Sequence, residues 1–233
     1  MSMGLGIGLH LGSSGGGASF NPATLSPYLW YAPNDAATIF QTTDTSTPGV
    51  DGQPCGRVND KSGNGYNAVQ ATAGFRSVWS SAGYLTFDGV DDGLSPAVAE
   101  TFSTSCDVFV GIKPNADTQY IIGLGGGGGF FGCAQSGNGG LTTSGAGTPT
   151  TRVNGTVVTD TRDALYTAIG AVPALFELNG ADLATTFGNI SIANYGGFEL
   201  SGRIYSYFIC PALSAGNRAL ARTYFGAQMG LTL

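Results

Sequence analysis

Short apolar runs separated by turn-forming clusters recur from residue 20 onward, and this spacing constrains the fold more than any other feature of the chain. Several runs alternate apolar and polar residues with a period of two, which is typical of half-buried strands. Their spacing of about 8–12 residues is typical of antiparallel sandwiches. The sequence therefore predicts an all-β protein. The runs expected to form strands are residues 84–87, 107–113, 120–124, 152–159, 165–169, 174–178, 189–193 and 203–210.

Two Asn-Gly pairs predict where strands turn back on themselves. A two-residue hairpin of type I′ needs a positive φ at both central residues, and Asn followed by Gly adopts it at little cost. We therefore expect a tight hairpin at Asn154-Gly155 and a second hairpin at Asn179-Gly180.

One helix is expected, close to the C-terminus. Ser214 can cap its first turn, and the helix should run from there until Gly230 ends it. Arg218 and Arg222 share one face of this helix, and Leu220 and Tyr224 share another. A short helix of this kind is expected to pack as a closing element.

Charge is scarce and glycine is abundant, which favours strands and loops over long amphipathic helices. Only 10% of the residues are charged, against about 25% in ordinary soluble domains, and 39 of the 233 residues are glycine. The net charge of −6 with nine basic residues indicates that nucleic acid is not a partner. No apolar run reaches 18 residues, so membrane insertion is not expected.

Residues 1–19 form a glycine-rich arm that precedes a domain at 20–233. In the arm Leu5, Ile7, Leu9 and Leu11 alternate with glycine or histidine, which is a strand pattern with almost no side chain on one face. Two interpretations stay open: a disordered tail, favoured by the conformational entropy of glycine, or a strand that adds to the sheet edge of a neighbouring chain.

The N-terminal segment lacks a basic region and its apolar residues are interrupted by glycine, so a secretory leader is not expected. We expect synthesis and assembly in a cytosol. The cysteines are widely spaced and do not form CxxC pairs, which predicts reduced and mostly buried thiols. They are Cys55, Cys106, Cys133 and Cys210.

Two motifs carry a resemblance to a known family. They are GRVNDKSGNGYNA at residues 56–68 and LTFDGVDD at residues 85–92. The chain resembles the laminin-G-like and concanavalin A-like domains of bacteriophage virion proteins, and the likeness covers nearly all of residues 20–233. It implies an antiparallel β-sandwich of the jelly-roll type with one short C-terminal helix. Shorter matching segments are LWY at 29–31, IFQ at 39–41, VNG at 153–155, GRIY at 202–205 and LS at 213–214.

The resemblance also implies a function without catalysis. Such domains serve as tail fibres, head spikes or head decorations, which would make this chain a structural protein of a virion assembled in a host cytoplasm. The expected partners are other virion proteins through the arm, host-surface polysaccharide, and further copies of the chain in a homo-oligomer, with a trimer favoured. Two alternatives are a purely architectural decoration protein and a polysaccharide-cleaving enzyme.

The acidic residues of the two motifs are expected to hold turns. Asp and Asn beside Gly bond to their own backbone and so stabilise tight turns. Asp60, Asp91 and Asp92 are the alternative candidates for a calcium site, because calcium prefers carboxylate and carbonyl oxygens. An EF-hand loop that starts at Asp60 is excluded because its twelfth position is Ala71. The expected turn residues are Asp60, Ser62, Gly63, Asn64, Asp88, Gly89, Asp91, Asp92, Asn154 and Gly155.

Motifs for catalysis and nucleotide binding are poorly represented. The letters GLGGGG at residues 123–128 match a dinucleotide fingerprint, but no helical pattern follows them, so we expect a hairpin tip. The one histidine, His10, lies in the arm, which excludes histidine-based nucleophilic catalysis within the domain. No cofactor is expected. The glutamates are Glu100, Glu177 and Glu199, and an Asp pair assembled from distant loops is the remaining route to hydrolysis.

Three aromatic residues are candidates for glycan binding, because sugar rings stack on exposed aromatic faces. Tyr66, Trp79 and Tyr195 stand among Gly, Asn and Ser. The alternative for each is that its ring covers one end of the sandwich. Exposed aromatics around one loop cluster would favour glycan binding over architecture.

Overall fold

The computed structural model describes residues 20–115, 119–184, 187–188, 190–192 and 198–233. The prediction of an attachment strand at Leu5, Ile7, Leu9 and Leu11 lies outside these residues.

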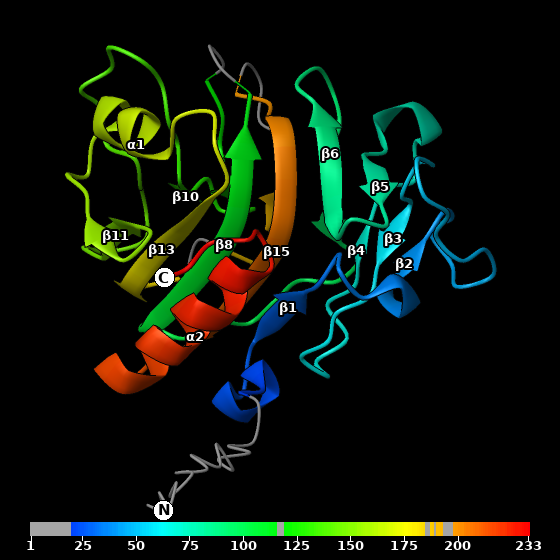
Figure 1. The fold of residues 1–233 in the computed structure, drawn as a ribbon, viewed down its shortest axis with the longest axis horizontal. Coiled ribbons are helices and arrows are strands. Elements are labelled where there is room, and N and C mark those ends of the chain that lie inside the picture. Colours follow the sequence, from blue (N-terminus) through cyan, green and yellow to red (C-terminus); the bar gives the residue numbers. More distant parts are fainter. Residues whose placement is uncertain (1–19, 116–118, 185–186, 189, 193–197) are drawn as a thin grey trace, which may run out of the picture.

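An antiparallel sheet of 8 strands runs through the middle of the molecule (Figure 1). The two longest strands, β8 (Cys106–Pro114) and β15 (Ser201–Pro211), pair along most of their length. On its other side β15 pairs with β6 through its first half and with β1 through its second half. The order is β12-β11-β13-β8-β15-β6-β5. The remaining bounds are β1 (Leu29–Tyr31), β5 (Val78–Ser80), β6 (Tyr84–Asp88), β11 (Thr150–Val153), β12 (Thr156–Val157) and β13 (Ala174–Ala181).

Two smaller antiparallel sheets pack against one face of this large sheet. Their inward side chains belong to the same hydrophobic core as those of the large sheet, and the Phe131 and Phe176 rings stack with centroids 6.4 Å apart. A bridge between Leu94 and Ile192 links the two small sheets. One is β10 (Phe130–Phe131), β9 (Gly123–Leu124) and β14 (Ser191–Ile192); the other is β2 (Ile39–Phe40), β3 (Arg57–Val58), β4 (Ala68–Val69) and β7 (Ser95–Pro96).

The opposite face of the large sheet is covered by the C-terminal helix α2 (Ala215–Ala227), which lies across β8 and β15 (Figure 1). Side chains alternate between the two faces of a strand, so Val108 and Val110 face the main core while Phe109 faces α2. The Phe225 ring of α2 lies 4.9 Å from that of Phe208, centroid to centroid. The central strands are therefore buried on both faces. The prediction of a mostly β, antiparallel fold with a closing C-terminal helix is confirmed.

The predicted cap of α2 and its predicted end at Gly230 are both confirmed. Ser214 Oγ accepts a hydrogen bond from the Asn217 N–H at 3.2 Å. The last regular helical residue is Ala227, and Gly230, with a φ of +75°, closes the helix: its N–H donates to the Ala227 oxygen at 3.1 Å, and the Leu231 N–H donates to the Gly226 oxygen at 3.0 Å.

Residues 165–169 were expected to form a strand, and this prediction is wrong. They belong to helix α1 (Arg162–Ile169), which Thr161 caps by accepting the Ala164 N–H. Leu165 and Ile169 are both buried, as residues four positions apart on one helix face. A five-residue apolar run fits either structure, and here the N-cap decides for the helix.

One of the two Asn-Gly pairs forms the predicted hairpin. Asn154 and Gly155 have φ values of 51° and 81° between β11 and β12. The prediction of a hairpin at Asn179-Gly180 is wrong, because both residues lie inside β13. Gly180 has a φ of 76°, and the pairing of β13 with β8 shifts between Asn179 and Ala181. The positive φ therefore produces a β-bulge and not a turn.

The four cysteines are free and buried, as predicted. Burial raises the pKa of the Cys55 thiol to about 12, which keeps this thiol protonated and unreactive.

None of the helices in the described ranges is long and apolar enough to cross a membrane. The short 3-10 helices are η1 (Pro22–Leu25), η2 (Ala36–Thr38) and η3 (Ala73–Phe75).

Replacing Phe225 with alanine should destabilise the protein strongly, because its fully buried ring is the main contact of α2 with the sheet. We expect Phe225→Ala to lower the free energy of unfolding by about 3–5 kcal/mol in urea titrations. The matched control on the same helix is Leu220→Ala, whose side chain is 49% exposed. A loss of equal size for both variants would contradict this packing.

Candidate functional site

The first motif, at residues 56–68, forms a turn that holds β1 in place. Asp60 Oδ1 accepts the N–H groups of Trp30 at 3.0 Å and Ser62 at 2.9 Å, and its Oδ2 accepts the Tyr66 N–H at 3.1 Å. Asn64 Nδ2 donates to the backbone oxygens that precede β1. Both carboxylate oxygens of Asp60 therefore accept hydrogen bonds from the backbone, as the turn interpretation predicts.

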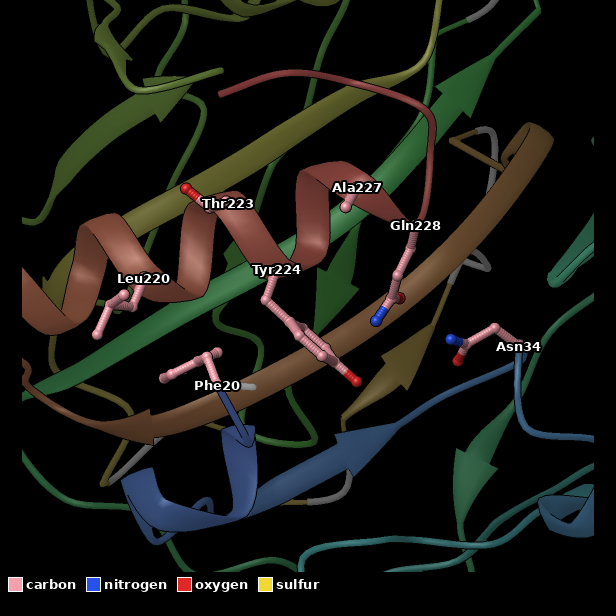
Figure 2. Close-up of a pocket in the computed structure, with 7 residues that line it drawn as sticks. All are labelled: Phe20, Asn34, Leu220, Thr223, Tyr224, Ala227 and Gln228. Atoms are coloured by element: carbon pink, nitrogen blue, oxygen red, sulfur yellow. The ribbon is translucent and has the colours of Figure 1, made fainter. Parts of the chain in front are cut away.

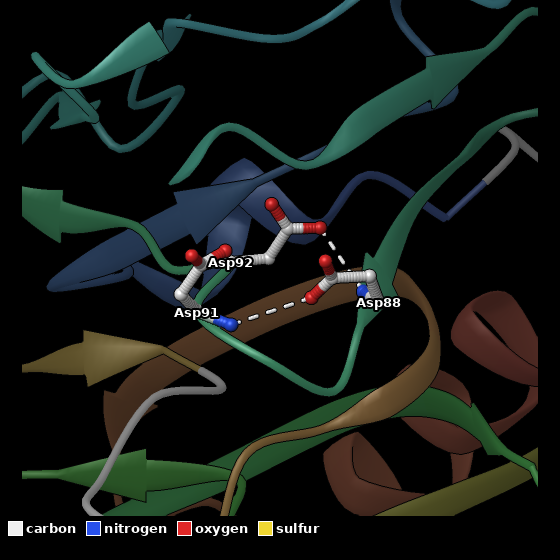
Figure 3. A group of neighbouring side chains, drawn as sticks. All are labelled: Asp88, Asp91 and Asp92. Atoms are coloured by element: carbon white, nitrogen blue, oxygen red, sulfur yellow. Dashed lines mark hydrogen bonds between the residues drawn. The ribbon is translucent and has the colours of Figure 1, made fainter. Parts of the chain in front are cut away.

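The second motif, at residues 85–92, closes a turn with three neighbouring carboxylates (Figure 3). Asp88 Oδ1 accepts the Val90 N–H at 2.8 Å, and Asp92 Oδ2 accepts the Asp88 N–H at 3.0 Å. One oxygen from each of Asp88, Asp91 and Asp92 lies within 4.8 Å of the others, and Asp60 is not part of this group. Of the three calcium candidates, the structure brings together Asp91 and Asp92, and the expected turn residue Asp88 lies beside them. Calcium at this position stays a prediction.

Asp92 is the buried member of this group. Burial, and to a smaller extent the nearby charges of Asp88 and Asp91, together raise its carboxyl pKa to about 6, although the hydrogen bond from the Asp88 N–H lowers it. The carboxyl is therefore only partly ionised near pH 6 in the folded protein.

Two of the three candidate sugar platforms lie among the described residues, and neither is a free exposed ring. Trp79 is 5% exposed and its Nε1 donates to the Pro33 oxygen at 2.8 Å, which agrees with the interpretation that its ring covers the sandwich and not with an exposed platform. Tyr66 is half-buried against the core, and its hydroxyl accepts the Thr101 N–H at 3.2 Å. Tyr195 lies outside the described residues. Trp79 and Tyr66 therefore cover the fold, as the alternative interpretation has it.

Two buried ion pairs fasten α2 to the large sheet. Arg218 donates to both oxygens of Asp107 at 2.6 and 3.0 Å, and Arg222 donates to both oxygens of Glu177 at 2.9 and 2.8 Å. Both carboxylate side chains are fully buried. The hydrogen bonds that each guanidinium donates to its carboxylate raise the pKa of that guanidinium above its ordinary value, so both arginines are positively charged at neutral pH.

Sequence reasoning did not assign these acids a role. Asp107 and Glu177 stand within two otherwise apolar strand segments, and an acid at a buried strand position needs a cationic partner. The i, i+4 spacing of Arg218 and Arg222 was the matching signal on the helix. The carboxylate of Glu177 is committed to its arginine, and Glu100 Oε2 accepts the Ile190 N–H at 3.0 Å.

An apolar groove of about 540 Å³ runs along the other side of α2, next to the first described residue (Figure 2). The Phe20 and Tyr224 rings meet edge to face with centroids 5.8 Å apart. The side-chain amide of Gln228 lines the groove, and neither its nitrogen nor its oxygen has a hydrogen-bond partner in the described part of the chain. The lining residues are Phe20, Asn34, Leu220, Thr223, Tyr224, Ala227 and Gln228.

Comparison of the chain with protein-family models, with curated protein sequences and with solved structures finds no match.

Substitution of Gly89 should disrupt the second motif. Its φ is +79°, and an added Cβ would lie 2.6 Å from Ser201 Cβ on the neighbouring strand. We expect Gly89→Ala to lower the free energy of unfolding by about 3 kcal/mol or more, because strain and a clash act together. Gly63→Ala is the control: its φ is +90° but nothing lies within 4 Å, so strain alone should cost about 1 kcal/mol. Thermal or urea unfolding of both variants would measure this difference, and equal losses would contradict it.

The raised pKa of Asp92 predicts a pH dependence of stability. An unfolded Asp titrates near about 3.9, whereas Asp92 in the folded protein titrates at about 6. The folded state therefore binds this proton more tightly. Its contribution to stability is fully present below about pH 4 and is lost as the pH rises through about 6.

Asp92→Asn should remove this dependence. Because asparagine keeps an oxygen to accept the Asp88 N–H, the variant should be more stable than the parent at pH 7 by on the order of 1 kcal/mol. Unfolding curves at pH 4, 5, 6 and 7 measure the effect. In the control Asp91→Asn the dependence should persist, since burial is its largest cause. Identical pH profiles for the parent and Asp92→Asn would refute the assignment.

Proposed function

We propose that this chain is a non-enzymatic structural protein of a bacteriophage-type virion. In this proposal residues 20–233 are a jelly-roll domain of the laminin-G-like or concanavalin A-like type, residues 1–19 attach it to the particle, and the domain binds host-surface glycan. The resemblance of residues 56–68 and 85–92 to this family supports the proposal. The turn geometry of Asp60 and Asp88 is consistent with it, because both motifs serve the fold.

The observation that carries the attachment role is the position of the apolar groove. Phe20, which follows the arm directly, forms one wall of the groove, and Leu220 and Tyr224 of α2 form another. Apolar walls beside an amide that has no partner suit contact with another polypeptide, whose backbone can satisfy both the amide nitrogen and the amide oxygen. The groove thus supports assembly at the end of the domain where the arm begins.

The chemistry of the other groups supports a role without catalysis in a reducing compartment. The four cysteines are buried thiols, as expected for assembly in a host cytoplasm. Glu177 is held by an arginine on both of its oxygens. A homo-oligomer, with a trimer favoured, would repeat the groove in each copy and so give a symmetric attachment.

A purely architectural role is the second candidate, and the burial of the candidate sugar platforms favours it. Trp79 is covered and Tyr66 is half-buried, so neither presents a free aromatic face to a sugar. In this case the groove and the arm would contact only other virion proteins.

An array of bacterial capsular polysaccharides and lipopolysaccharides, probed with the purified full-length chain, tests the proposal. We expect saturable binding to at least one glycan, glycan chains of unchanged length after incubation, and a trimer by light scattering. Absence of binding to every glycan would favour the architectural candidate. Shortened chains would overturn the non-enzymatic assignment.

The role of the arm needs its own variant. Replacing Leu5, Ile7, Leu9 and Leu11 with serine keeps the length of the arm and removes its apolar side chains. We expect this variant to be lost from assembled particles while its glycan binding as a soluble protein stays within about twofold, because the arm lies outside the domain. Incorporation equal to that of the parent would contradict attachment through the arm.

A further inference from the structure

A small polar pocket of about 210 Å³ lies on the side of α2 opposite the apolar groove. It is bounded by the first half of α2 and by the neighbouring strands β11 and β13. Three of its lining residues are arginines, although the chain has only nine basic residues in 233. The lining residues are Arg152, Asn179, Ala215, Arg218 and Arg222.

Within the described ranges, one of the three positive charges of the pocket has no acidic partner at ion-pair distance. Arg218 and Arg222 are balanced by the buried carboxylates of Asp107 and Glu177. Arg152 instead donates to neutral acceptors, namely Asn179 Oδ1 at 3.1 Å and the Gly155 oxygen at 2.8 Å. Three guanidinium groups thus face two carboxylates, which leaves a surplus of one positive charge within an otherwise acidic protein.

Several hydrogen-bond donors at the pocket have no partner among the described residues. Each of the three guanidinium groups uses two of its nitrogens, and its third nitrogen donates to no described residue. Asn179 is 8% exposed, and its buried Nδ2 has no hydrogen-bond partner within the described ranges. A buried donor without a partner is unfavourable, so an oxygen atom that enters here replaces a missing bond. The first turn of α2, at Ala215, adds the positive end of its helix dipole.

The hairpin at Asn154-Gly155 holds the pocket in shape. The Gly155 N–H donates to Glu177 Oε1 at 2.9 Å, while its carbonyl accepts Arg152. A Cβ at Gly155 would lie 2.8 Å from Arg222 Nε, so the close approach of this turn to the arginine requires glycine. The arginines are therefore positioned before any ligand arrives, which lowers the entropic cost of binding.

The charge and geometry of the pocket indicate the class of ligand. Guanidinium groups match the planar, two-oxygen shape of a carboxylate, and one surplus positive charge matches one carboxylate. The pocket is smaller than the roughly 300–1,000 Å³ of typical ligand sites, so it suits one charged group with part of a ring and not an oligosaccharide.

We propose that Arg152, Arg218, Arg222 and Asn179 form a binding site for the carboxylate of an acidic sugar residue, such as a uronic acid, in host-surface glycan. The claim that the carboxylate belongs to a host glycan rests on the proposed function. The claim that the pocket binds an anion rests on the structure of the pocket alone. The site would let the chain recognise a glycan without using Trp79 or Tyr66 as an aromatic platform.

Titration with sodium glucuronate, at ionic strength held constant with sodium chloride, tests the site directly. We expect the arginine side-chain Nε–H signals of Arg152, Arg218 and Arg222 to shift in NMR spectra of the full chain, and glucose to leave them unchanged. If glucuronate causes no shift, or if inorganic phosphate shifts the same signals as strongly, the assignment to a sugar carboxylate is overturned.

The informative substitution is Arg152→Gln, because removal of Arg218 or Arg222 would leave a buried acid without a partner and could unfold the protein. We expect Arg152→Gln to weaken glucuronate binding at least about tenfold while the melting temperature changes little. Arg203→Gln is the control: it removes the same charge from β15, where Arg203 lies over the Tyr84 ring, and should leave affinity unchanged. Equal weakening by both variants would show a general charge effect and overturn the site.

The array of bacterial glycans is extended with hyaluronate, which is acidic, and dextran, which is neutral. It then tests the carboxylate site and the proposed function together. If the parent binds acidic glycans and Arg152→Gln does not, the result supports both the carboxylate site and the adhesin function. Binding of neutral glycans alone, unaffected by Arg152→Gln, overturns the carboxylate site and leaves the adhesin function in place. If no glycan on the array is bound, the adhesin function fails, and the glucuronate titration then decides on the pocket by itself.

Discussion

Two acidic residues buried on the outer face of the large sheet organise the structure around them. A carboxylate removed from water costs several kcal/mol unless it is paired and hydrogen-bonded, and Asp107 and Glu177 are both fully buried. Each is bound by an arginine of α2 on both oxygens. Asp107 also accepts the N–H of Gly180 in the β13 bulge, and Glu177 accepts that of Gly155 in the hairpin. The helix, the bulge and the hairpin are therefore tied to the same two groups.

The docking of α2 creates the two surfaces on which the functional proposals rest. The helix packs on the sheet through Phe225 and Ala221, which leaves its two long sides facing different neighbours. One side meets β11 and β13 and brings its arginines to Arg152; the other faces Phe20 and forms the apolar groove. The two proposed roles, attachment and recognition, therefore lie on different sides of one helix.

Local chemistry explains which parts of the fold could be predicted from sequence. The apolar segments that form β8 and β15, the hairpin at Asn154-Gly155 and the cap at Ser214 depend on residues that are close in the chain. The failures were also local: the run at 165–169 fits a strand or a helix equally well, and Asn179-Gly180 provides positive φ for a bulge as readily as for a turn.

The sequence by itself determined a mostly β, antiparallel fold, turn roles for Asp60 and Asp88, and buried, reduced cysteines, because periodicity, turn chemistry and apolar content act over short distances. Only the tertiary structure decided which polar groups meet. Arg152 stands 66 residues before Arg218 in the chain, and strand pairing together with the docking of α2 brings both to one pocket. Trp79 is covered for the same reason, since its surroundings come from distant segments such as Pro33. Burial and charge balance are properties of the packed molecule, and no short window of sequence contains them.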